Sequence, residues 1–408
     1  MAMRMTFKKA LVAVAAFASA FAAIAAPFTV VYEAGSGKDP VSLRDLQCAG
    51  EGGVLFRNVL AADLGRSGWF EVAQGNLAAD IRVAGAASGQ GSSVATRIRV
   101  TWKGGSFDWG EASSGVAEVR WQAHRLSDEI VRRIKNRPGM AATRIAFVGK
   151  EGGGGMICFC DSDGYGFRKF GREATSPLSP YFAPDGRSIF YTSFIRNFAC
   201  VYHVSIADGR RAPLANFTGL NAGGAVSPDG RLVAVILSHP GNPELFVINT
   251  ATRRATRLTT TRRGAEASPC WSPDGNRIAY VSDETGAPHV FVIDSESKKA
   301  KRITFRGSQN VAPSWGADGR IAFCTKMGNY EIAVYDPATG QTDIVSPGGA
   351  DYEDPSWAPD GRHIVCSRRD GRVCSLWVLD TFKDGDPPVR IPLPAGDWRS
   401  PDWSRPIK

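Results

Sequence analysis

A strand–turn–strand pattern of apolar and polar residues recurs along the last two thirds of the chain. Residues 271–282 show it most clearly, because a Trp-Ser-Pro-Asp-Gly segment precedes an alternating apolar run. Pro273 pre-sets its backbone angle, Asp274 can bond the backbone two residues further on, and Gly275 accepts a positive φ. The segment therefore predicts the end of one strand, a tight turn and the whole of the next strand.

This hairpin pattern repeats at a nearly constant interval. The turn aspartates are Asp185, Asp229, Asp274, Asp318 and Asp360, which are 44, 45, 44 and 42 residues apart. The apolar residue that opens the following strand is Ile145, Ile189, Val233, Ile278, Ile321 or Ile364, which adds a sixth copy at residues 143–148. In the fourth copy, strands are expected at residues 278–282, 290–294 and 300–305. A period in the forties with about four strands per copy is typical of a β-propeller blade.

The two ends of the repeat region are complementary. Residues 143–148 have the strand without the turn before it, and residues 401–404 repeat the Pro-x-Trp-Ser of residues 269–272. We therefore predict a six-bladed β-propeller of WD40-like (PD40) repeats over residues 139–408. The C-terminal strand near Trp403 should complete the blade that begins at Arg144. Such closure removes two open sheet edges. An open stack of hairpins would gain nothing from a repeat that is divided between the two ends of the region.

Residues 26–138 have a mixed helix and strand pattern. One helix is expected over residues 54–64, with Asp63 and Arg66 on its exposed side. A second is expected over residues 121–136, with Leu126, Ile130 and Ile134 on one face, and it should end before Pro138 and Gly139. Alternation at residues 79–83 and 94–102 predicts strands beneath these helices. The expected product is a small two-layer α/β domain.

The first 25 residues have the pattern of an export signal. Arg4, Lys8 and Lys9 precede a run of small and apolar residues at 10–24, and Ala25 ends a small-x-small cleavage site. An uncleaved membrane anchor is the alternative, although the run is short for a bilayer span. No later segment is long and apolar enough to cross a membrane, so the mature chain is expected to be exported without an integral membrane segment.

Charge changes this picture little. The formal net charge of the chain is +9, and three of the positive charges lie in the signal. Clusters of the other cations lie at residues 253–254, 262–263 and 298–302, each near an expected outer strand of a blade. Neither interleaved stacking aromatics nor a coherent basic face is visible. We therefore interpret these cations as charges on exposed strand edges and expect no nucleic-acid partner.

The eight cysteines favour buried thiols, although an oxidising compartment would permit disulfides. Cys366 and Cys374 lie symmetrically about the expected turn at residues 369–371 and could face each other on a hairpin. Cys158 and Cys160 are two residues apart on one strand, so they should point to the same face. Spacing alone leaves the connectivity open, and no histidine pairs with cysteines at metal-ligand spacing.

Catalysis has little support in the residues. The five histidines are scattered over different elements, and His124 is interpreted as a packed helix residue. Residues 161–164 resemble part of a calcium loop but lack the downstream glutamate, so a turn is expected. No Gly-x-Ser-x-Gly elbow accompanies the propeller. We therefore expect no enzymatic activity, no cofactor and no metal.

A binding face is predicted where each outer strand connects to the next inner strand. Six such connections converge at one mouth of the central channel, and their mixture of polar, acidic and apolar residues is typical of a protein interface. The candidate partner-binding residues are Leu178, Leu220, Asn221, Gly223, Glu266, Ala267, Gln309, Asn310, Asp351, Tyr352, Glu353, Asp397 and Trp398. Among them Leu220, Tyr352 and Trp398 are expected as apolar anchors.

Several motifs outside the blade repeat resemble one known family. They lie at residues 61–70, 123–130, 138–148, 161–165, 302–310 and 393–397. In this order along nearly all of the mature chain, they resemble the TolB family of the Tol-Pal system.

The resemblance implies a non-enzymatic periplasmic scaffold. Members bind the peptidoglycan-associated lipoprotein Pal through one propeller face, communicate with TolA through the N-terminal segment, and support outer-membrane integrity and constriction at cell division. Here the N-terminal domain looks short and residues 26–33 resemble the family's N-terminal peptide only weakly, so the implied TolA contact is the less supported one. The alternatives are an exported propeller that binds peptides or glycans in its channel, and a propeller hydrolase or lyase.

Overall fold

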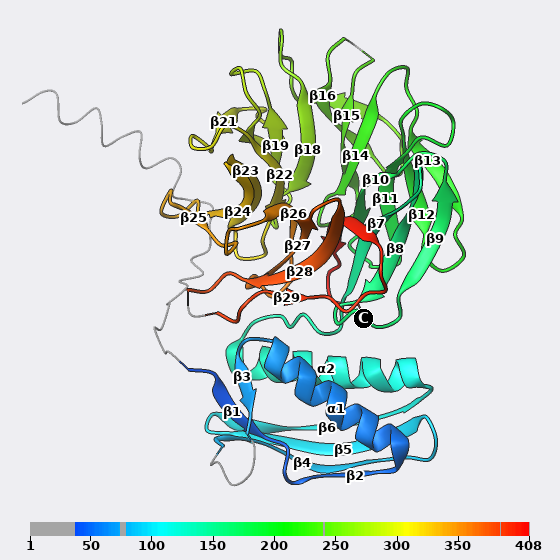
Figure 1. Ribbon diagram of the computed structural model, residues 1–408, viewed down its shortest axis with the longest axis vertical. Coiled ribbons are helices and arrows are strands. Elements are labelled where there is room, and N and C mark those ends of the chain that lie inside the picture. Colours follow the sequence, from blue (N-terminus) through cyan, green and yellow to red (C-terminus); the bar gives the residue numbers. More distant parts are fainter. Residues whose placement is uncertain (1–36, 74–78, 240, 384, 408) are drawn as a thin grey trace, which may run out of the picture. The chain divides into compact units, whose positions relative to one another are not determined.

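The computed structural model describes residues 37–73, 79–239, 241–383 and 385–407 (Figure 1). The expected export signal with its cleavage site at Ala25, and the N-terminal peptide at residues 26–33, lie outside the described residues. Within the described ranges, no helix has the length and apolar character needed to cross a membrane.

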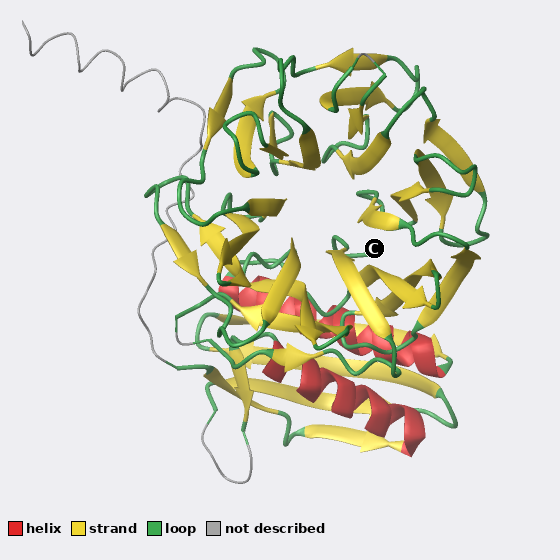
Figure 2. Cartoon of the chain, turned by 45° about the horizontal axis from the view of Figure 1, so that its top comes forward, coloured by secondary structure: helices red, strands yellow, loops and turns green. Residues whose placement is uncertain are grey.

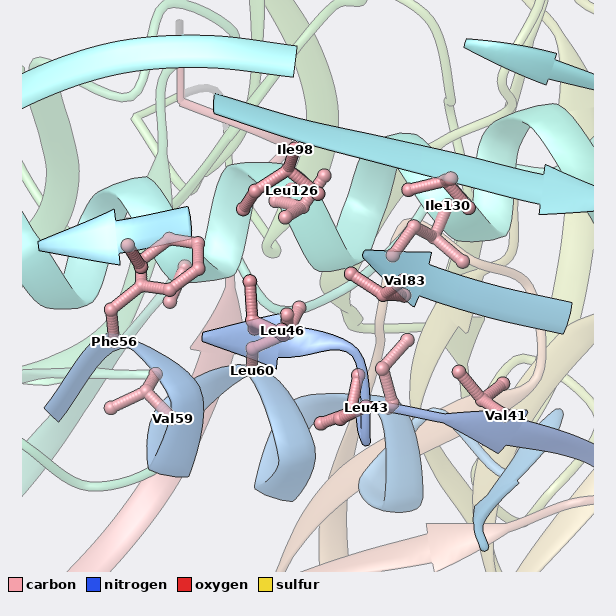
Figure 3. Close-up of a cluster of buried hydrophobic side chains, with 14 of the residues drawn as sticks. Val41, Leu43, Leu46, Phe56, Val59, Leu60, Val83, Ile98, Leu126 and Ile130 are labelled. Carbon is pink, nitrogen blue, oxygen red and sulfur yellow. The ribbon is translucent and has the colours of Figure 1, made fainter. Parts of the chain in front are cut away.

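The first region of residues 38–408 is a mixed sheet with two helices packed against it. It contains β1 (Asp39–Ser42), β2 (Leu46–Ala49), α1 (Gly50–Arg66), β3 (Phe70–Val72), β4 (Ile81–Ser88), β5 (Ser93–Trp102), β6 (Gly105–Ser114) and α2 (Val116–Lys135). The strand order is β3-β1-β4-β5-β6, and β2 also pairs with β4. Figure 3 shows the apolar side chains of α1, α2 and the sheet meeting in one core, including Phe56, Leu60, Val83, Ile98 and Leu126.

Both helices are longer than the apolar pattern predicts. The apolar face of α2 is the predicted one, since Leu126 and Ile130 are fully buried and Ile134 packs against the same core. Helix α1 begins four residues early, because Gly52 and Gly53 lie so close to the sheet that a Cβ atom would meet the carbonyl oxygens of Ser93 and Ala87. Such a close approach requires glycine.

The prediction that Asp63 lies on the exposed side of the first helix is wrong. Only 2% of Asp63 is exposed, and its carboxylate accepts hydrogen bonds from Arg66 and from Nδ1 of His124 at 2.6 Å. A buried carboxylate needs such partners to offset its desolvation. The long strand β6 was not predicted, because its many glycine, serine and acidic residues hide the alternation.

In the described residues the second region forms six four-stranded sheets around a central axis, as Figure 2 shows. Blade one contains β30 (Asp397–Trp403), β7 (Arg144–Glu151), β8 (Gly154–Asp161) and β9 (Arg168–Glu173), and blade two contains β10 (Leu178–Phe182), β11 (Ser188–Ser193), β12 (Cys200–Ser205) and β13 (Arg211–Ala215). Blade three contains β14 (Asn221–Val226), β15 (Leu232–Leu237), β16 (Glu244–Asn249) and β17 (Ala255–Arg257), and blade four contains β18 (Glu266–Trp271), β19 (Arg277–Ser282), β20 (His289–Asp294) and β21 (Ala300–Arg302). Blade five contains β22 (Asn310–Trp315), β23 (Ile321–Met327), β24 (Asn329–Tyr335) and β25 (Thr342–Ile344), and blade six contains β26 (Asp351–Trp357), β27 (His363–Asp370), β28 (Val373–Asp380) and β29 (Val389–Arg390). An α/β region followed in the sequence by a six-bladed propeller is the predicted fold.

The predicted closure by the C-terminal strand is confirmed. Strand β30 pairs antiparallel with β7, and Trp403 lies opposite Ile145. The backbone N–H groups of Ser404 and Arg144 donate at 2.8 Å to the Arg144 carbonyl and the Ser404 hydroxyl, respectively. The Trp403 Nε1–H group donates to Thr143 Oγ1 at 2.7 Å. The innermost strand of blade one therefore comes from the opposite end of the propeller sequence.

Every inner strand contains a bulge. Its left-handed residue is Ser179, Gly223, Ser268, Ala312, Asp354 or Ser400, with φ between 46° and 89°. The strand pairing shifts next to each of these residues. In five blades the residue that follows is proline. Proline has no backbone N–H group, so its position in the bulge leaves no strand-pairing hydrogen bond unmade. The bulges bend the six inner strands where they line the channel.

All eight cysteines lie within the described residues and are free thiols, seven of them buried. Cys158 and Cys160 share one core cluster, as predicted. The prediction that Cys366 and Cys374 could face each other on a hairpin is wrong. The turn is centred between Gly371 and Arg372 rather than on Asp370, so that Cys366 pairs with Trp377 and Cys374 with Arg369.

Candidate functional site

The candidate partner-binding residues lie at or just before the beginning of the six inner strands, at one mouth of the channel. The expected connections are therefore largely strand, since β14, β18, β22, β26 and β30 begin at Asn221, Glu266, Asn310, Asp351 and Asp397. The channel encloses a cavity of about 480 Å³ whose lining includes residues of all six inner strands. The structure thus brings the candidate residues to one ring, and their side chains divide into three groups.

The first group is exposed at the mouth. It consists of Leu178, Leu220, Ala267 and Gln309. The Gln309 side chain accepts a hydrogen bond from the Tyr330 hydroxyl at 3.0 Å, and the Leu220 backbone N–H donates to Ser238 Oγ at 2.8 Å. These contacts hold exposed apolar and amide groups in fixed positions around the opening.

The second group is buried, and two of its members were expected as exposed anchors. That expectation is wrong for Tyr352 and Trp398, which are only 3% and 4% exposed. Trp398 packs edge-on against Phe147 at 5.7 Å and Phe167 at 5.2 Å, and Tyr352 lies in a core cluster formed by blades five and six. The second residue of these two inner strands points between adjacent sheets, where a large ring fills the core.

Asn221, Gly223, Asn310 and Glu266 are also buried. The Asn221 amide donates to the carbonyls of Ala199, Phe217 and Gly219 at 3.1, 2.7 and 3.1 Å, so it fixes the loop before its strand. The Asn310 amide donates in the same way to the Arg306 carbonyl at 2.8 Å.

Glu266 occupies the corresponding position in blade four but does not bond the preceding loop in this way. The Ser282 and Thr261 hydroxyls lie near its carboxyl group and lower its pKa, although neither makes a well-formed hydrogen bond to a carboxylate oxygen in the described residues. Burial, with the nearby charges of Glu244 and Glu284, raises the pKa of Glu266 to about 7. This carboxyl group therefore holds its proton to near neutral pH.

The third group is an acid–base cluster at the starts of blades six and one. Arg369 pairs with Glu353 at 2.8 Å and lies 3.9 Å from Asp351. Arg399 pairs with Asp397 at 2.8 Å, and Asp397 also accepts the Cys374 N–H at 3.0 Å. Although burial favours neutral Asp397, these donors hold its pKa below the usual range.

The two arginines of this cluster were not predicted as site residues. Arg369 comes to the mouth because it lies opposite Asp351 in the β26–β27 pairing. That register depends on the bulge beside Asp354, which the sequence pattern does not reveal. Arg399 lies two residues after Asp397 on the same strand, so that both side chains are on one face of the sheet and can pair.

Two further carboxyl groups face the channel below the mouth. Asp354 accepts a hydrogen bond from Ser400 Oγ at 2.9 Å. Asp402 accepts from the Phe182 N–H at 2.7 Å and from Ser356 Oγ at 3.3 Å. Burial raises the pKa of both groups, that of Asp402 to about 7. The described residues contain no group of three or more His, Cys, Asp or Glu that could hold a metal ion.

The turn at residues 161–164 contacts helix α2. Asp163 accepts hydrogen bonds from Arg120 and, at 3.0 Å, from the Tyr165 N–H, so its carboxylate serves an ion pair within a turn. His124 is a packed helix residue with Nε2 3.9 Å from Asp163. Burial disfavours its charged form, but the neighbouring Asp63 carboxylate outweighs burial and raises the pKa of His124.

Comparison with known proteins gives one consistent result. Residues 131–407 match the family described as the TolB beta propeller domain. The Tol-Pal system protein TolB of Methylobacillus flagellatus is 33% identical over 187 residues, which span 40% of this chain and 43% of that protein. The protein of the same name from Anaeromyxobacter dehalogenans is 33% identical over 156 residues, which span 38% of this chain and 35% of that protein. The matched stretches thus span less than half of these relatives.

The solved structures include one similar to nearly the whole chain. The crystal structure of TolB from Acinetobacter baumannii superimposes with a TM-score of 0.76 at 25% sequence identity. The match covers 90% of this chain and 97% of that one, so it includes the α/β region as well as the propeller.

Proposed function

The chain belongs to the TolB β-propeller family, and from this premise we propose that it is a periplasmic, non-enzymatic component of a Tol-Pal envelope complex. Its partner is a Pal-like peptidoglycan-associated lipoprotein, held at the channel mouth. In this role it supports outer-membrane integrity and constriction at cell division. The names of the similar proteins support the membership in a Tol-Pal system.

One structural observation supports the mouth as the partner-binding face. Exposed Leu178, Leu220, Ala267 and Gln309 follow one another around the ring on blades two to five, and the half-buried acid–base cluster of Asp351, Glu353 and Asp397 completes the ring on blades six and one. Exposed apolar and amide side chains beside oriented charges are typical of a protein interface. Because the charged groups are already paired within the chain, little ordering is needed when a partner docks.

The experiment is a calorimetric titration of the protein with the periplasmic domain of the Pal-like lipoprotein from the same source. The variant Leu220→Arg/Ala267→Arg/Gln309→Arg places three bulky charges on exposed positions of the mouth. We expect affinity to fall at least about tenfold, because each change removes complementarity at the centre of the face. The control is Ala317→Arg, at an exposed position that lines the opposite end of the channel, and it should bind normally.

Unchanged affinity of the folded triple variant would contradict the proposal. Substitution of Trp398 is unsuitable here, because the buried ring supports the core of blade one. A second candidate function, binding of a peptide or glycan inside the channel, is favoured only by the cavity itself. A ligand that binds more weakly to the Asp402→Asn variant, and equally well to the triple variant of the mouth, would support this second function.

The proposal includes a TolA-like partner for the N-terminal segment. That segment lies outside the described residues. Titration of a TolA-like domain with the protein before and after removal of residues 26–36 tests this contact.

A further inference from the structure

Cations are distributed unevenly around the circumference of the propeller. The outer strands and adjoining loops of blades three and four carry an exposed set that we term the basic edge: Arg253, Arg254, Arg262, Arg263, Lys298, Lys299, Lys301 and Arg306. The corresponding stretch of blade five, residues 328–350, contains no lysine or arginine and exposes Asp343. The two neighbouring edges are therefore opposite in character.

The cations of the basic edge contribute little to the fold. In the described part of the chain none of the eight takes part in an ion pair, and the Arg253 side chain donates one long hydrogen bond, to the Pro213 carbonyl at 3.4 Å. By contrast, Arg257 in the outer strand of blade three pairs with Glu244 at 2.8 Å. Exposed lysines and arginines that lie close together repel one another. Their concentration on one edge thus costs some stability and indicates an anionic partner.

Two exposed apolar side chains stand beside the basic edge. Phe305 is 72% exposed and Met327 is 58% exposed, the two highest values among the large hydrophobic residues that the structure describes. The loop containing Phe305 is joined to the hairpin containing Met327, because the Ser308 N–H donates to the Lys326 carbonyl at 3.0 Å and the Lys326 N–H to the Gln309 carbonyl at 2.9 Å. The Arg302 guanidinium lies 5.1 Å from the Phe305 ring centre.

Cations together with protruding aromatic and apolar side chains are the combination that binds a bilayer interface. A single-stranded nucleic acid would instead need a groove with successive aromatic platforms, and Phe305 is the one exposed aromatic ring in the described residues 253–306. We propose that the basic edge docks on a membrane surface of anionic phospholipids, with Phe305 and Met327 entering the headgroup layer.

The position of the basic edge in the ring suits such docking. Helix α2 contacts blade one through Arg120 and Asp163, and Trp69 of the α/β region packs against Phe382 of blade six at 5.4 Å. In a six-membered ring, blades three and four are opposite to these two. A membrane at the basic edge therefore leaves the contact with the α/β region undisturbed, and the inference does not depend on the lipoprotein partner.

The test is co-sedimentation of the purified protein with vesicles of phosphatidylglycerol and phosphatidylcholine, compared with vesicles of phosphatidylcholine alone. We expect binding only to the anionic vesicles, weakening as salt is added. The variant Lys298→Asn/Lys299→Gln/Lys301→Gln should bind roughly 100-fold more weakly, since each cation near an anionic surface contributes a factor of about five. Asparagine is chosen at position 298 because φ there is 57°.

The matched control is Arg82→Gln/Arg97→Gln/Lys103→Gln, which removes the same charge from exposed positions of the α/β region. It should bind like the unaltered protein. Phe305→Ala should weaken binding while leaving its salt dependence unchanged, because it removes an apolar contact only.

Three results would overturn the proposal. One is the absence of any preference of the unaltered protein for anionic vesicles. Another is an equal loss in the control, which would reduce the effect to net charge. The third is displacement from the vesicles by an oligonucleotide or heparin at lower concentration than the lipid, combined with no effect of Phe305→Ala, which would assign the edge to a polyanionic polymer.

Discussion

The first residue of the inner strands in blades three, four and five points into the protein. The amide N–H groups of Asn221 and Asn310 donate there to the carbonyls of the preceding loop. Glu266 occupies the same position with a carboxyl group that Ser282 and Thr261 satisfy only weakly, and burial outweighs them and raises its pKa to about 7. A buried acid with weak partners favours its neutral form.

The pKa of Glu266 leads to a pH-dependent prediction. A carboxyl group whose pKa is raised in the folded state adds stability below the unfolded pKa, and that stability is lost as pH rises through about 7. Glu266→Gln should therefore match the unaltered protein near pH 5 and exceed it by about 1–3 kcal/mol in unfolding free energy near pH 8. Urea unfolding at the two pH values measures this.

The control for this prediction is Glu296→Gln, an exposed glutamate of the same blade. It should change stability by less than about 0.5 kcal/mol at either pH. Equal stability of Glu266→Gln and the unaltered protein at pH 8 would contradict the buried-acid interpretation.

At the scale of elements, the turn between β8 and β9 and helix α2 form one charged contact. Arg120 and Asp163 are both largely buried, and His124 lies behind them. Removing one partner of a buried ion pair leaves the other charge uncompensated. The turn at residues 161–164 therefore contributes to the stability of the fold through this buried ion pair.

Asp163→Asn should lower the unfolding free energy by about 3–5 kcal/mol. It should also flatten the pH dependence above pH 6.5, because a raised His124 pKa gives stability that is lost as pH rises through the folded value, and Asp163 contributes to that raise. Calorimetry and hydrogen exchange of α2 measure both effects. Asp208→Asn, in an exposed turn of blade two, should change little.

The apolar pattern predicts strands better than it predicts their pairing. Ile278 and its counterparts mark a strand in every blade, because the core between blades requires an apolar residue there. The register of a hairpin depends instead on turn geometry. The observed partner of Cys366 is Trp377, which lies three residues beyond the expected partner Cys374.

The dependence of strand register on turns and bulges also explains why the candidate site is predicted only in part. The sixfold repeat correctly places the beginnings of the inner strands at one mouth. It does not tell which side chains face solvent, because the bulge beside Asp354 or Ser400 changes the facing of the residues before it. Tyr352 and Trp398 look like interface anchors in the sequence and are core residues in the structure.

At the scale of the whole molecule, the ring depends on β30. Deletion of residues 397–408 should leave β7 with an open edge and remove Trp398 and Trp403 from the core of blade one. Because unpaired edges associate, we expect aggregation and loss of the cooperative thermal transition. Size-exclusion chromatography and calorimetry test this.

The shorter deletion of residues 405–408 keeps β30 and serves as the control. It removes the hydrogen bond from the Arg405 side chain to the Pro228 carbonyl at 3.2 Å and that from the Ile407 N–H to the Ala142 carbonyl at 3.0 Å. It should remain a soluble monodisperse protein. A soluble, cooperatively unfolding protein after the longer deletion would contradict the need for closure.

The free thiols tie the lifetime of the protein to its rate of unfolding. Burial raises the pKa of Cys158 and Cys270 to about 12, so neither thiol is reactive while the chain is folded. In an oxidising compartment, each global opening would expose seven thiols that are otherwise protected, and random pairing among them would prevent refolding. What preserves such a chain is then the height of its unfolding barrier rather than its equilibrium stability.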